Sequence, residues 1–350
     1  MMKLPTFFPG RVGVVCLAFI LSILPTQAND RVEVDPMRDY LFEYRLNGFT
    51  QADYQAAVNL TLAQFEHLSG RELKPGGKGK VGLKVFTSSG AGLSTPLPLV
   101  RSVINALVER GYAREDIIIV DMFERRLREA GFLPRLSQGG DDFEGSPVVA
   151  LESGEHYVPE WYYDSPLPSR EVGSPARHFD VGDYQPDPEE RKSFLPVPLF
   201  LEVDFWINLP MAADNRAFGL SGAIANATLW NISNSNRFLE SPANAPVAMA
   251  EIAAIPELTE TWLLTMLTLE HYQFMGGPRY NAGYSRGEPA LWTSANPVIL
   301  DFLMWRRINA WRERLSLPLI EPEPLFLEYC RSLGLGEYDP SRLKLVPLNP

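Results

Sequence analysis

Residues 81–120, VGLKVFTSSGAGLSTPLPLVRSVINALVERGYAREDIIIV, decide the fold class. The apolar run over 81–86 is typical of a short buried strand, and a loop of small residues follows over 87–95. Pro96 stands where helices often begin, and an apolar face with helical spacing comes after it. The β-branched residues at 117–120 predict a second strand. This order predicts a βαβ unit with parallel strands and a right-handed crossover.

Helical and strand patterns continue over the rest of the chain. Thr50 and Asp53 form the pattern of a capping box, and Asn296 with Pro297 is typical of another helix start. The apolar spacing predicts helices over 54–68, 123–130, 219–230, 246–255, 297–315 and 324–333, and strands over 148–151, 200–209, 262–269 and 343–346. This alternation favours an α/β fold with a mostly parallel sheet and flanking helices.

Residues 1–28 resemble a secretory signal peptide. The start is positively charged, an apolar run of 13 residues follows over 12–24, and cleavage is expected near Ala28 and Asn29. A helix needs about 20 residues to span a bilayer, so this run is too short to cross one. We therefore predict export to the periplasm or the extracellular space, with no membrane span after the signal is removed. An uncleaved N-terminal anchor is the alternative.

After the signal peptide, we expect an N-terminal helical segment over 29–74 and an α/β domain over 75–350. Residues 154–198 interrupt this domain with eight prolines and many Tyr, Asp and Glu residues. A loop of that length without secondary structure is uncommon in a compact domain. We interpret it as a Pro-rich excursion that holds a hairpin or two, or that forms a lid.

Charge and cysteine content exclude several classes of partner and cofactor. The 350 residues include 32 Lys and Arg and 43 Asp and Glu, a formal net charge of −11. The chain has no block of cations, which argues against nucleic acid as a partner, because phosphate contacts need clustered cations. Loss of residues 1–28 would leave Cys330 as the one cysteine. We therefore expect no iron–sulfur cluster and no intrachain disulfide, and the sequence leaves any other cofactor unknown.

The loop over 87–95 is the first candidate ligand site. Small residues between a parallel strand and a helix leave backbone N–H groups exposed, and these favour an anion. Open α/β sheets also bind ligands at the carboxyl ends of their strands. Lys84, on the preceding strand, would supply a counter-charge, although a turn that only reverses the chain is the alternative. The candidate ligand-binding residues of the loop are Ser88, Ser89, Gly90, Gly92, Ser94 and Thr95.

Glu270 and His271 follow the strand predicted over 262–269. A carboxylate beside an imidazole is a reasonable acid–base pair. Adjacent strand residues point to opposite faces, so we expect one of the two to enter a given pocket. Together with Lys84, these are the candidate catalytic residues.

A Gly-rich turn comes next and contains Gly276 and Gly277, with Arg279 and Arg286 close by. These arginines would hold a carboxylate or a phosphate, and a solvated loop is the equal alternative. The acidic residues around His178 lack the spacing of metal ligands, so we predict no metal site.

Several motifs stand in a definite order along residues 75–346. They are VGLKV at 81–85, STP at 94–96, LV at 99–100, ERG at 109–111, DFWINLP at 204–210, GLSGA at 219–223, GGP at 276–278, NPV at 296–298 with Asp301, and LGLG at 333–336. In this order they resemble domain-of-unknown-function family 362. The resemblance implies an α/β fold and adds Asn208, Asn226 and Asp301 to the candidate ligand-binding residues. The family favours lysines where this chain has Met211 and Ala225, and we expect no ferredoxin-like module such as some members carry, because its cysteines are missing here.

Three hypotheses about function remain open at this point. The first is an exported, soluble α/β protein that binds a small anionic ligand at its strand-end loops, with Lys84 and Arg279 as charge partners. The second is a non-catalytic binding or structural protein that keeps the fold without the family's polar site. The third is a metal-dependent enzyme of lactate-racemase-like architecture. The sequence does not decide whether the chain is an enzyme.

Overall fold

The computed structural model describes residues 36–165, 191–239 and 242–348. The predicted signal peptide, residues 1–28, lies outside these ranges, as do residues 166–190 of the Pro-rich excursion. The chain divides into two units, Met1–Glu33 and Val34–Pro350, and the description below concerns the second.

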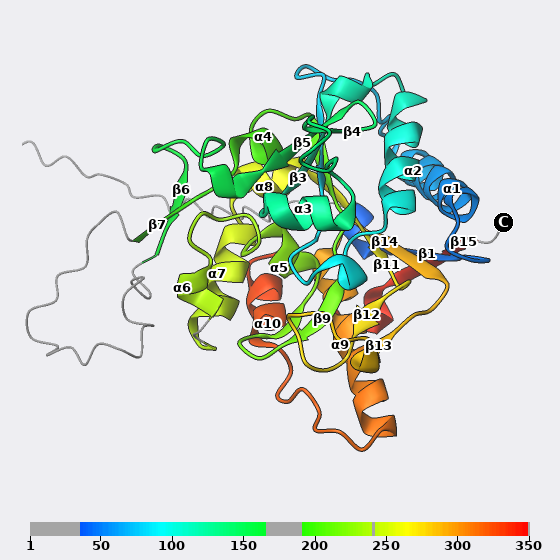
Figure 1. Ribbon diagram of the computed structural model, residues 1–350. Helices are drawn as coiled ribbons and strands as arrows, with labels where there is room; N and C mark the ends of the chain where they lie inside the picture. The colour runs from blue at the N-terminus through cyan, green and yellow to red at the C-terminus, as the bar shows by residue number, and fades with distance from the viewer. Residues whose placement is uncertain (1–35, 166–190, 240–241, 349–350) are drawn as a thin grey trace, which may run out of the picture. The chain divides into compact units, whose positions relative to one another are not determined.

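A nine-stranded sheet forms the centre of this unit (Figure 1). Five of its eight neighbouring strand pairs are parallel and three are antiparallel, which confirms the predicted α/β fold with a mostly parallel sheet. In order across the sheet, the strands are β15 (Lys344–Leu348), β1 (Tyr40–Arg45), β14 (Ala290–Ser294), β11 (Trp262–Thr268), β8 (Phe205–Asn208), β2 (Val81–Lys84), β3 (Ile117–Asp121), β5 (Ser146–Ala150) and β4 (Asp142–Phe143).

The predicted βαβ unit lies at the middle of the sheet. Strands β2 and β3 are parallel, and helix α2 (Leu97–Val108) connects them. Lys84 at the end of β2 pairs with Val120 of β3 on one side and with Asn208 of β8 on the other. The carboxyl ends of three strands therefore meet at one edge of the sheet.

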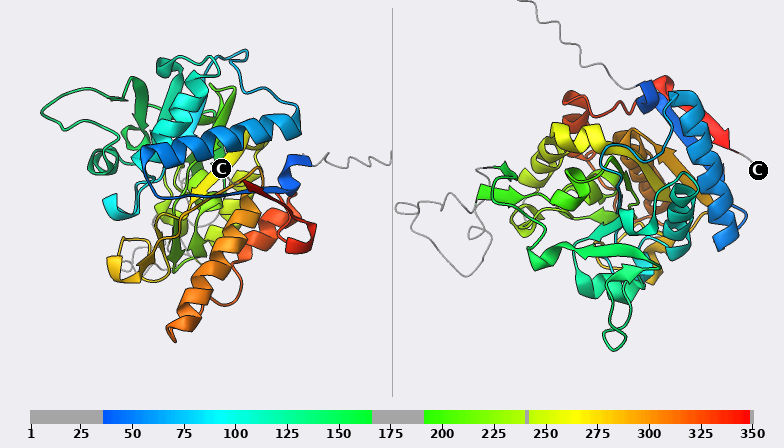
Figure 2. Two further views of the ribbon diagram at one scale, coloured as in Figure 1. Left: turned by 90° about the vertical axis from the view of Figure 1, so that its right-hand side faces the viewer. Right: turned by 90° about the horizontal axis from the view of Figure 1, so that it is seen from above.

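Helices cover both faces of the sheet (Figures 1 and 2). Alternate residues of β3 point to separate cores, Ile117 and Ile119 to one and Ile118 and Val120 to the other. The first core includes side chains from α1 (Gln51–Ser69), α2 and α3 (Glu124–Ala130). The second includes side chains from α4 (Val197–Phe200), α5 (Ala223–Ala227), α6 (Asn236–Leu239), α7 (Asn244–Ala253), α8 (Pro256–Thr261), α9 (Pro297–Arg314) and α10 (Leu325–Ser332).

Both predicted helix starts are confirmed. Thr50 and Asp53 form a reciprocal capping box ahead of α1, in which each side chain accepts a hydrogen bond from the backbone N–H of the other residue. The Asn296 side chain accepts hydrogen bonds from the backbone N–H groups of Val298 and Ile299 at the start of α9. These contacts satisfy N–H groups that have no partner within the helix.

Two predicted elements are wrong in part. The strand predicted over 200–209 is limited to β8, because Val197–Phe200 instead forms the short helix α4 and buries Phe200. The helix predicted over 219–230 begins with strand β10 (Gly219–Ser221), which pairs antiparallel with β9 (Ala212–Asn215). Gly219, at φ +83°, enters this strand in a left-handed conformation that most residues avoid, so the helical pattern starts later.

Two smaller sheets lie beside the large one. The first has the order β10, β9, β12 (Tyr272–Gln273) and β13 (Ser285–Arg286). The second pairs β6 (Tyr162–Asp164) with β7 (Lys192–Phe194) in antiparallel orientation, which agrees with the hairpin predicted inside the excursion.

The segment predicted to be helical over 29–74 also supplies a strand to the large sheet, because β1 pairs with β14 and β15. Within the described ranges, no helix combines the length and the apolar character needed to cross a membrane.

Candidate functional site

Lys84 is fully buried at the carboxyl end of β2, with an exposed fraction of 0%. Its Nζ donates hydrogen bonds to Asp121 Oδ1 at 2.7 Å, to the carbonyl oxygen of Val85 at 2.7 Å and to Asn226 Oδ1 at 3.0 Å. Burial lowers the pKa of the Lys84 ammonium, and the adjacent Asp121 carboxylate opposes this effect. All three ammonium hydrogens thus have partners inside the protein.

The contacts around Lys84 extend to β8 and to helix α5. Asn226 Nδ2 donates to Asn208 Oδ1 at 2.8 Å, and Asn208 Nδ2 donates to the carbonyl oxygen of Ala223 at 2.8 Å. Asp121 Oδ2 accepts from the Thr87 backbone N–H at 2.8 Å and from Thr87 Oγ1 at 2.6 Å. We call these five side chains the strand-end network, whose members are Lys84, Thr87, Asp121, Asn208 and Asn226; each is 0% exposed.

Asp301 of α9 binds the N-terminus of the same helix, α5. Its two carboxyl oxygens accept hydrogen bonds from the backbone N–H groups of Ala223 at 2.6 Å and of Ile224 at 2.9 Å. Gly222 permits this contact, because a Cβ atom there would lie 2.2 Å from Asp301 Oδ1. Burial raises the pKa of Asp301 to about 7, against the opposing effect of the two amide hydrogen bonds.

Glu270 and His271 lie apart from the strand-end network. Glu270 accepts a hydrogen bond from the Tyr54 hydroxyl of α1 at 2.7 Å, so it belongs to the opposite face of the sheet from Lys84. Burial is the main cause that raises the pKa of Tyr54, which keeps this phenol protonated. His271 Nε2 lies 3.8 Å from Glu270 Oε1, and nearly half of the His271 side chain is exposed. The structure therefore does not bring the three candidate catalytic residues together.

The loop over 87–95 and the Gly-rich turn lie side by side. The backbone N–H of Tyr280 donates to the carbonyl oxygen of Ser89 at 3.0 Å, and the Ser89 hydroxyl donates to the carbonyl oxygen of Pro278. The Tyr280 ring covers Gly92, where an added Cβ would lie 2.2 Å from a ring carbon. An aromatic side chain thus fills the space beside this part of the loop.

Several donors of the loop are already bonded within the protein. The backbone N–H of Gly90 donates to Thr87, and that of Thr95 donates to Phe86. The Thr95 hydroxyl donates to the carbonyl oxygen of Leu209 at 2.6 Å, and the Ser94 hydroxyl donates to Gly90 at 2.9 Å. Ser88 differs from these residues, because its buried Oγ has no hydrogen-bond partner among the described residues.

The Gly-rich turn is held by an aspartate rather than left open. The backbone N–H groups of Gly276 and Gly277 donate to Asp214 at 3.1 and 2.7 Å, and Arg312 Nη2 donates to the same carboxylate at 2.9 Å. Arg279 is exposed. The Arg286 guanidinium lies 4.9 Å from the centroid of the Trp311 ring. Neither arginine therefore reaches the strand-end network.

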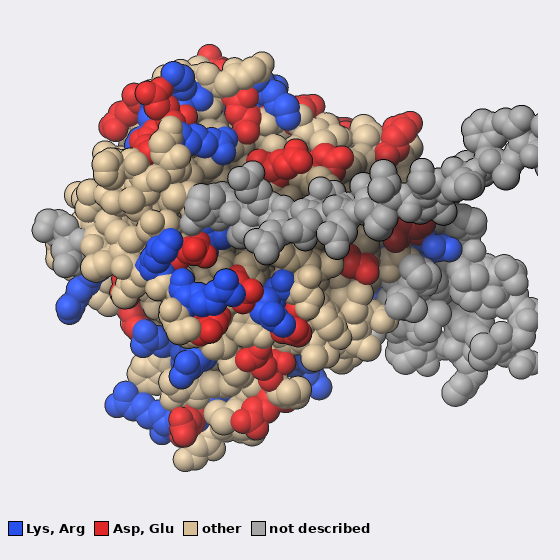
Figure 3. Space-filling model, turned by 180° about the vertical axis from the view of Figure 1, so that it is seen from behind, with Lys and Arg blue, Asp and Glu red and all other residues tan. Residues whose placement is uncertain are grey.

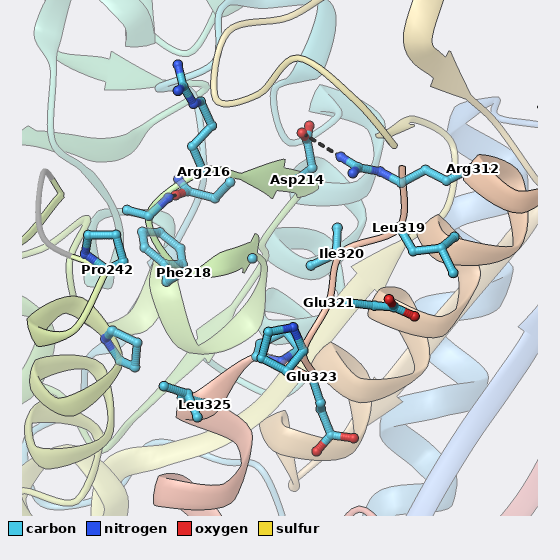
Figure 4. A pocket seen from close by; sticks show the side chains of 16 residues that line it. Asp214, Arg216, Phe218, Pro242, Arg312, Leu319, Ile320, Glu321, Glu323 and Leu325 are labelled. Carbon is cyan, nitrogen blue, oxygen red and sulfur yellow. Dashed lines mark hydrogen bonds and ion pairs between the residues drawn. The ribbon is translucent and has the colours of Figure 1, made fainter. Parts of the chain in front are cut away.

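A cavity of about 360 Å³ lies between the β9–β10 turn, the start of α7 and the segment ahead of α10 (Figure 4). We call it the β9–β10 cavity. Ligand pockets of proteins usually have volumes of about 300–1,000 Å³. Figure 4 shows the apolar side chains of Phe218, Ile320 and Leu325 in the lining, together with the charged side chains of Arg216, Glu321 and Glu323. The cavity therefore combines an apolar interior with charged groups at its rim.

Arg216 and Glu321 are exposed and make no hydrogen bond or ion pair with other described residues. Two further cavities, of about 420 and 280 Å³, lie beside Glu288 and Leu333 respectively. None of the three is lined by Glu270, by the strand-end network or by residues of the 87–95 loop. Among the described residues, no group of three or more His, Cys, Asp or Glu side chains is arranged to hold a metal ion.

Charges of both signs are mixed on the face of the protein that Figure 3 shows. Lys and Arg residues neighbour Asp and Glu residues there, so opposite charges compensate over short distances. Such a face produces little long-range attraction for a charged ligand.

Sequence reasoning did not identify Asp121 as the partner of Lys84, nor the β9–β10 cavity. Asp121 directly follows the β-branched run at 117–120, and Lys84 lies at the end of the other predicted strand. This was a usable signal, because side chains at the carboxyl ends of neighbouring parallel strands lie close together. The cavity arises from the 214–217 turn and the Pro-rich stretch at 318–324. The sequence of each stretch predicts only a loop, and it does not indicate that the two loops lie next to each other.

With the fold and the polar groups defined, the chain can be compared with known proteins. No family model matches it, and no curated protein matches it. A crystal structure of a protein from Thermotoga maritima is similar at 12% sequence identity and a TM-score of 0.39. The similarity covers 78% of this chain and 60% of that chain, so this chain spans about three fifths of the length of that protein. A TM-score of this size supports no argument about function.

The raised pKa of Asp301 predicts a specific pH dependence of stability. Between its ordinary value of about 4 and its folded value of about 7, the folded protein holds a proton that the unfolded chain has lost. The contribution of Asp301 to the free energy of unfolding should therefore fall as pH rises through this window, by at most about 1.4 kcal/mol per pH unit. Urea unfolding of the wild type and of Asp301→Asn across this window measures the difference. Parallel pH profiles of the two proteins would contradict the prediction.

Proposed function

We propose that this chain is a non-catalytic binding protein whose strand-end polar residues stabilise the fold. The observation that carries this proposal is that Lys84, Asp121 and Asn226 bond to one another at 0% exposure. A group that donates or accepts a proton in catalysis must reach the substrate. The polar groups of the strand-end network have no such access, because each side chain is 0% exposed and bonds to other network members or to nearby backbone groups.

We place the ligand in the β9–β10 cavity. Binding sites are typically concave and mostly apolar, with a few polar groups that orient the ligand. Phe218 and Ile320 supply apolar surface, and Arg216 and Glu321, which pair with no other described residue, supply the polar groups. The metal-dependent alternative stays a hypothesis: the described residues include no cluster of metal ligands, and His178 with its acidic neighbours lies outside the described residues.

We also propose that the chain is a divergent member of domain-of-unknown-function family 362. The motifs that carry the resemblance come from distant parts of the sequence, yet several of them meet. Lys84 and Asn208 are neighbours through β2 and β8, and Gly222 contacts Asp301. Residues that meet in this way favour a shared packing arrangement rather than a chance match.

The proposed function predicts a ligand that raises the thermal midpoint through the β9–β10 cavity. A ligand present at about 100 times its Kd stabilises a protein by about 2.7 kcal/mol, which raises the midpoint by several degrees. A thermal-shift screen of small organic molecules measures this. Leu319→Glu, which places a charge at a cavity-lining leucine that is 39% exposed, should reduce the shift. The control is Leu136→Glu, at a leucine that is 79% exposed and distant in the sequence, which should leave it unchanged.

A small-anion site at the 87–95 loop is the second candidate, and one observation favours it. Within the described ranges, Ser88 Oγ is buried without a hydrogen-bond partner, and Arg126 Nη1 lies 3.7 Å from the position that a Cβ atom would take at Gly90. The same screen therefore includes phosphate, sulfate and citrate. A midpoint shift that Ser88→Ala removes and that Leu319→Glu preserves would favour this loop over the cavity. A screen without any midpoint shift would contradict both binding proposals.

A further inference from the structure

Helix α10 has an apolar stripe on its exposed side. Leu325 and Tyr329 of α10, and Leu333 at its C-cap, are spaced by four residues and are 47%, 36% and 50% exposed. Residues at this spacing lie on the same side of a helix. Phe326 and Cys330, on the core side, are both 0% exposed. A helix that only closes a core needs one apolar side, so the exposed stripe requires a separate explanation.

The stripe lies beside a groove between α7 and α10. Pro246 of α7 and Leu325 of α10 line the β9–β10 cavity. Val247 and Tyr329 line the cavity of about 280 Å³, together with Leu333. Pro246 and Val247 are sequence neighbours, and Leu325 and Tyr329 are one helical turn apart, so the two cavities are adjacent. We name them together the α7–α10 seam.

The rim of the α7–α10 seam carries an excess of negative charge. Glu251 and Glu321 are exposed there, and Glu323 is half-buried. Among the residues that line the two cavities, Arg216 is the exposed cation. Complementary charge across an interface speeds encounter and selects partners, so this rim favours a cationic ligand.

We propose that the α7–α10 seam binds a short, cationic, amphipathic helical segment of a partner protein. This inference rests on the proposed function, because it names the class of ligand for the same surface. An amphipathic helix places apolar side chains at positions i and i+4 into an apolar groove. The exposed stripe extends about 12 Å from Leu325 to Leu333, the length of about two turns of a helix. Lysine or arginine residues on either side of that apolar face would lie beside the glutamates of the rim.

Two other occupants fit the surface less well. An anionic bilayer attracts basic surfaces, and the glutamates of the rim would be repelled by it. A second copy of this chain would bring the same acidic rim against itself, and like charges in contact oppose association. A cationic peptide is the occupant that satisfies both the apolar stripe and its charged border.

Fluorescence anisotropy with a labelled model peptide tests the proposal. The probe is a peptide of about 14 residues with leucines on one helical face and lysines elsewhere. We expect saturable binding to the full-length protein, and Leu333→Asn or Tyr329→Ser should weaken it at least about tenfold. The matched control is Leu136→Asn, at a leucine that is 79% exposed, which should bind like the wild type. The substituted side chains are exposed, so the variants should keep their fold, which circular dichroism checks.

A second arm tests the charge of the rim. The double variant Glu321→Gln, Glu323→Gln should bind the peptide more weakly at low salt and should show less weakening as salt is added. A peptide with glutamate in place of every lysine should not bind. Equal affinity for the two peptides would overturn the assignment of a cationic partner.

The remaining outcomes each reject the inference for a stated reason. If Leu333→Asn binds as well as the wild type, the peptide binds elsewhere. If Leu333→Asn instead abolishes binding to phosphatidylglycerol vesicles or abolishes dimer formation, the occupant is a bilayer or a second copy. A small-molecule midpoint shift that Leu319→Glu removes, without any peptide binding, would reject the inference and keep the proposed function.

Discussion

Lys84→Met should destabilise the protein by about 3–5 kcal/mol, because it leaves the buried Asp121 carboxylate without its counter-charge. Methionine fills nearly the same space as the aliphatic part of lysine, so the loss of the ammonium group is the main change. Asn226 Oδ1 also loses the hydrogen bond that it accepts from Lys84. Urea unfolding at neutral pH measures the difference in the free energy of unfolding.

Two further variants make this result specific. Lys80→Met changes a lysine close to β2 that is 41% exposed and lies 4.0 Å from Glu202, so it should alter stability by less than about 1 kcal/mol. The double variant Lys84→Met, Asp121→Asn removes both charges and should recover part of the loss. A Lys84→Met protein within about 1 kcal/mol of the wild type would show that the pair does not support the fold.

Asp301→Ala should be similarly destabilising, by about 2–6 kcal/mol. The substitution leaves two buried N–H groups, those of Ala223 and Ile224, without acceptors, and each such loss costs about 1–3 kcal/mol. Asp164→Ala is the matched control, because that aspartate is 53% exposed in an ion pair on the surface. Thermal and urea unfolding of the two variants against the wild type measure the effect.

A double-mutant cycle tests the contact of Asp301 with Gly222 directly. Gly222→Ala in the wild type forces a Cβ atom to within 2.2 Å of Asp301 Oδ1, so the protein should be destabilised by about 1–3 kcal/mol. In the Asp301→Ala background that oxygen is gone, and the same substitution should cost much less. If the changes in the free energy of unfolding of the two single variants add up to that of the double variant within about 0.5 kcal/mol, the two residues do not interact.

The sequence predicted the elements of the βαβ unit well, because their signals are local. The apolar run at 81–86, the proline at position 96 and the β-branched run at 117–120 each act over a few residues, and all three elements form. The helix caps at Thr50 and Asn296 also depend on local signals, because each side chain bonds to backbone N–H groups within three residues. The errors at 200–209 and 219–230 also have local causes, a helical turn after a proline and a glycine with positive φ.

The candidate site was less predictable, because its arrangement depends on contacts between distant residues. Lys84 and Asp121 are 37 residues apart, and Lys84 and Asn226 are 142 residues apart. The sequence identified Lys84, Asn208, Asn226 and Asp301 as polar residues of interest. It did not show that three of them, Lys84, Asn226 and Asn208, would be linked by hydrogen bonds at 0% exposure. Glu270 was grouped with Lys84, although the sheet separates the two side chains.

By itself, the sequence determined the fold class, the order of most helices and strands and the acidic charge, because each follows from residue type and local spacing. Only the tertiary structure decided which polar residues are available to a ligand. The strand ends that the sequence marked as a binding site are occupied by their own side chains, since a buried lysine is stable only beside a carboxylate and hydrogen-bond acceptors. The open apolar surface formed instead between α7 and α10, where two segments far apart in the sequence come together.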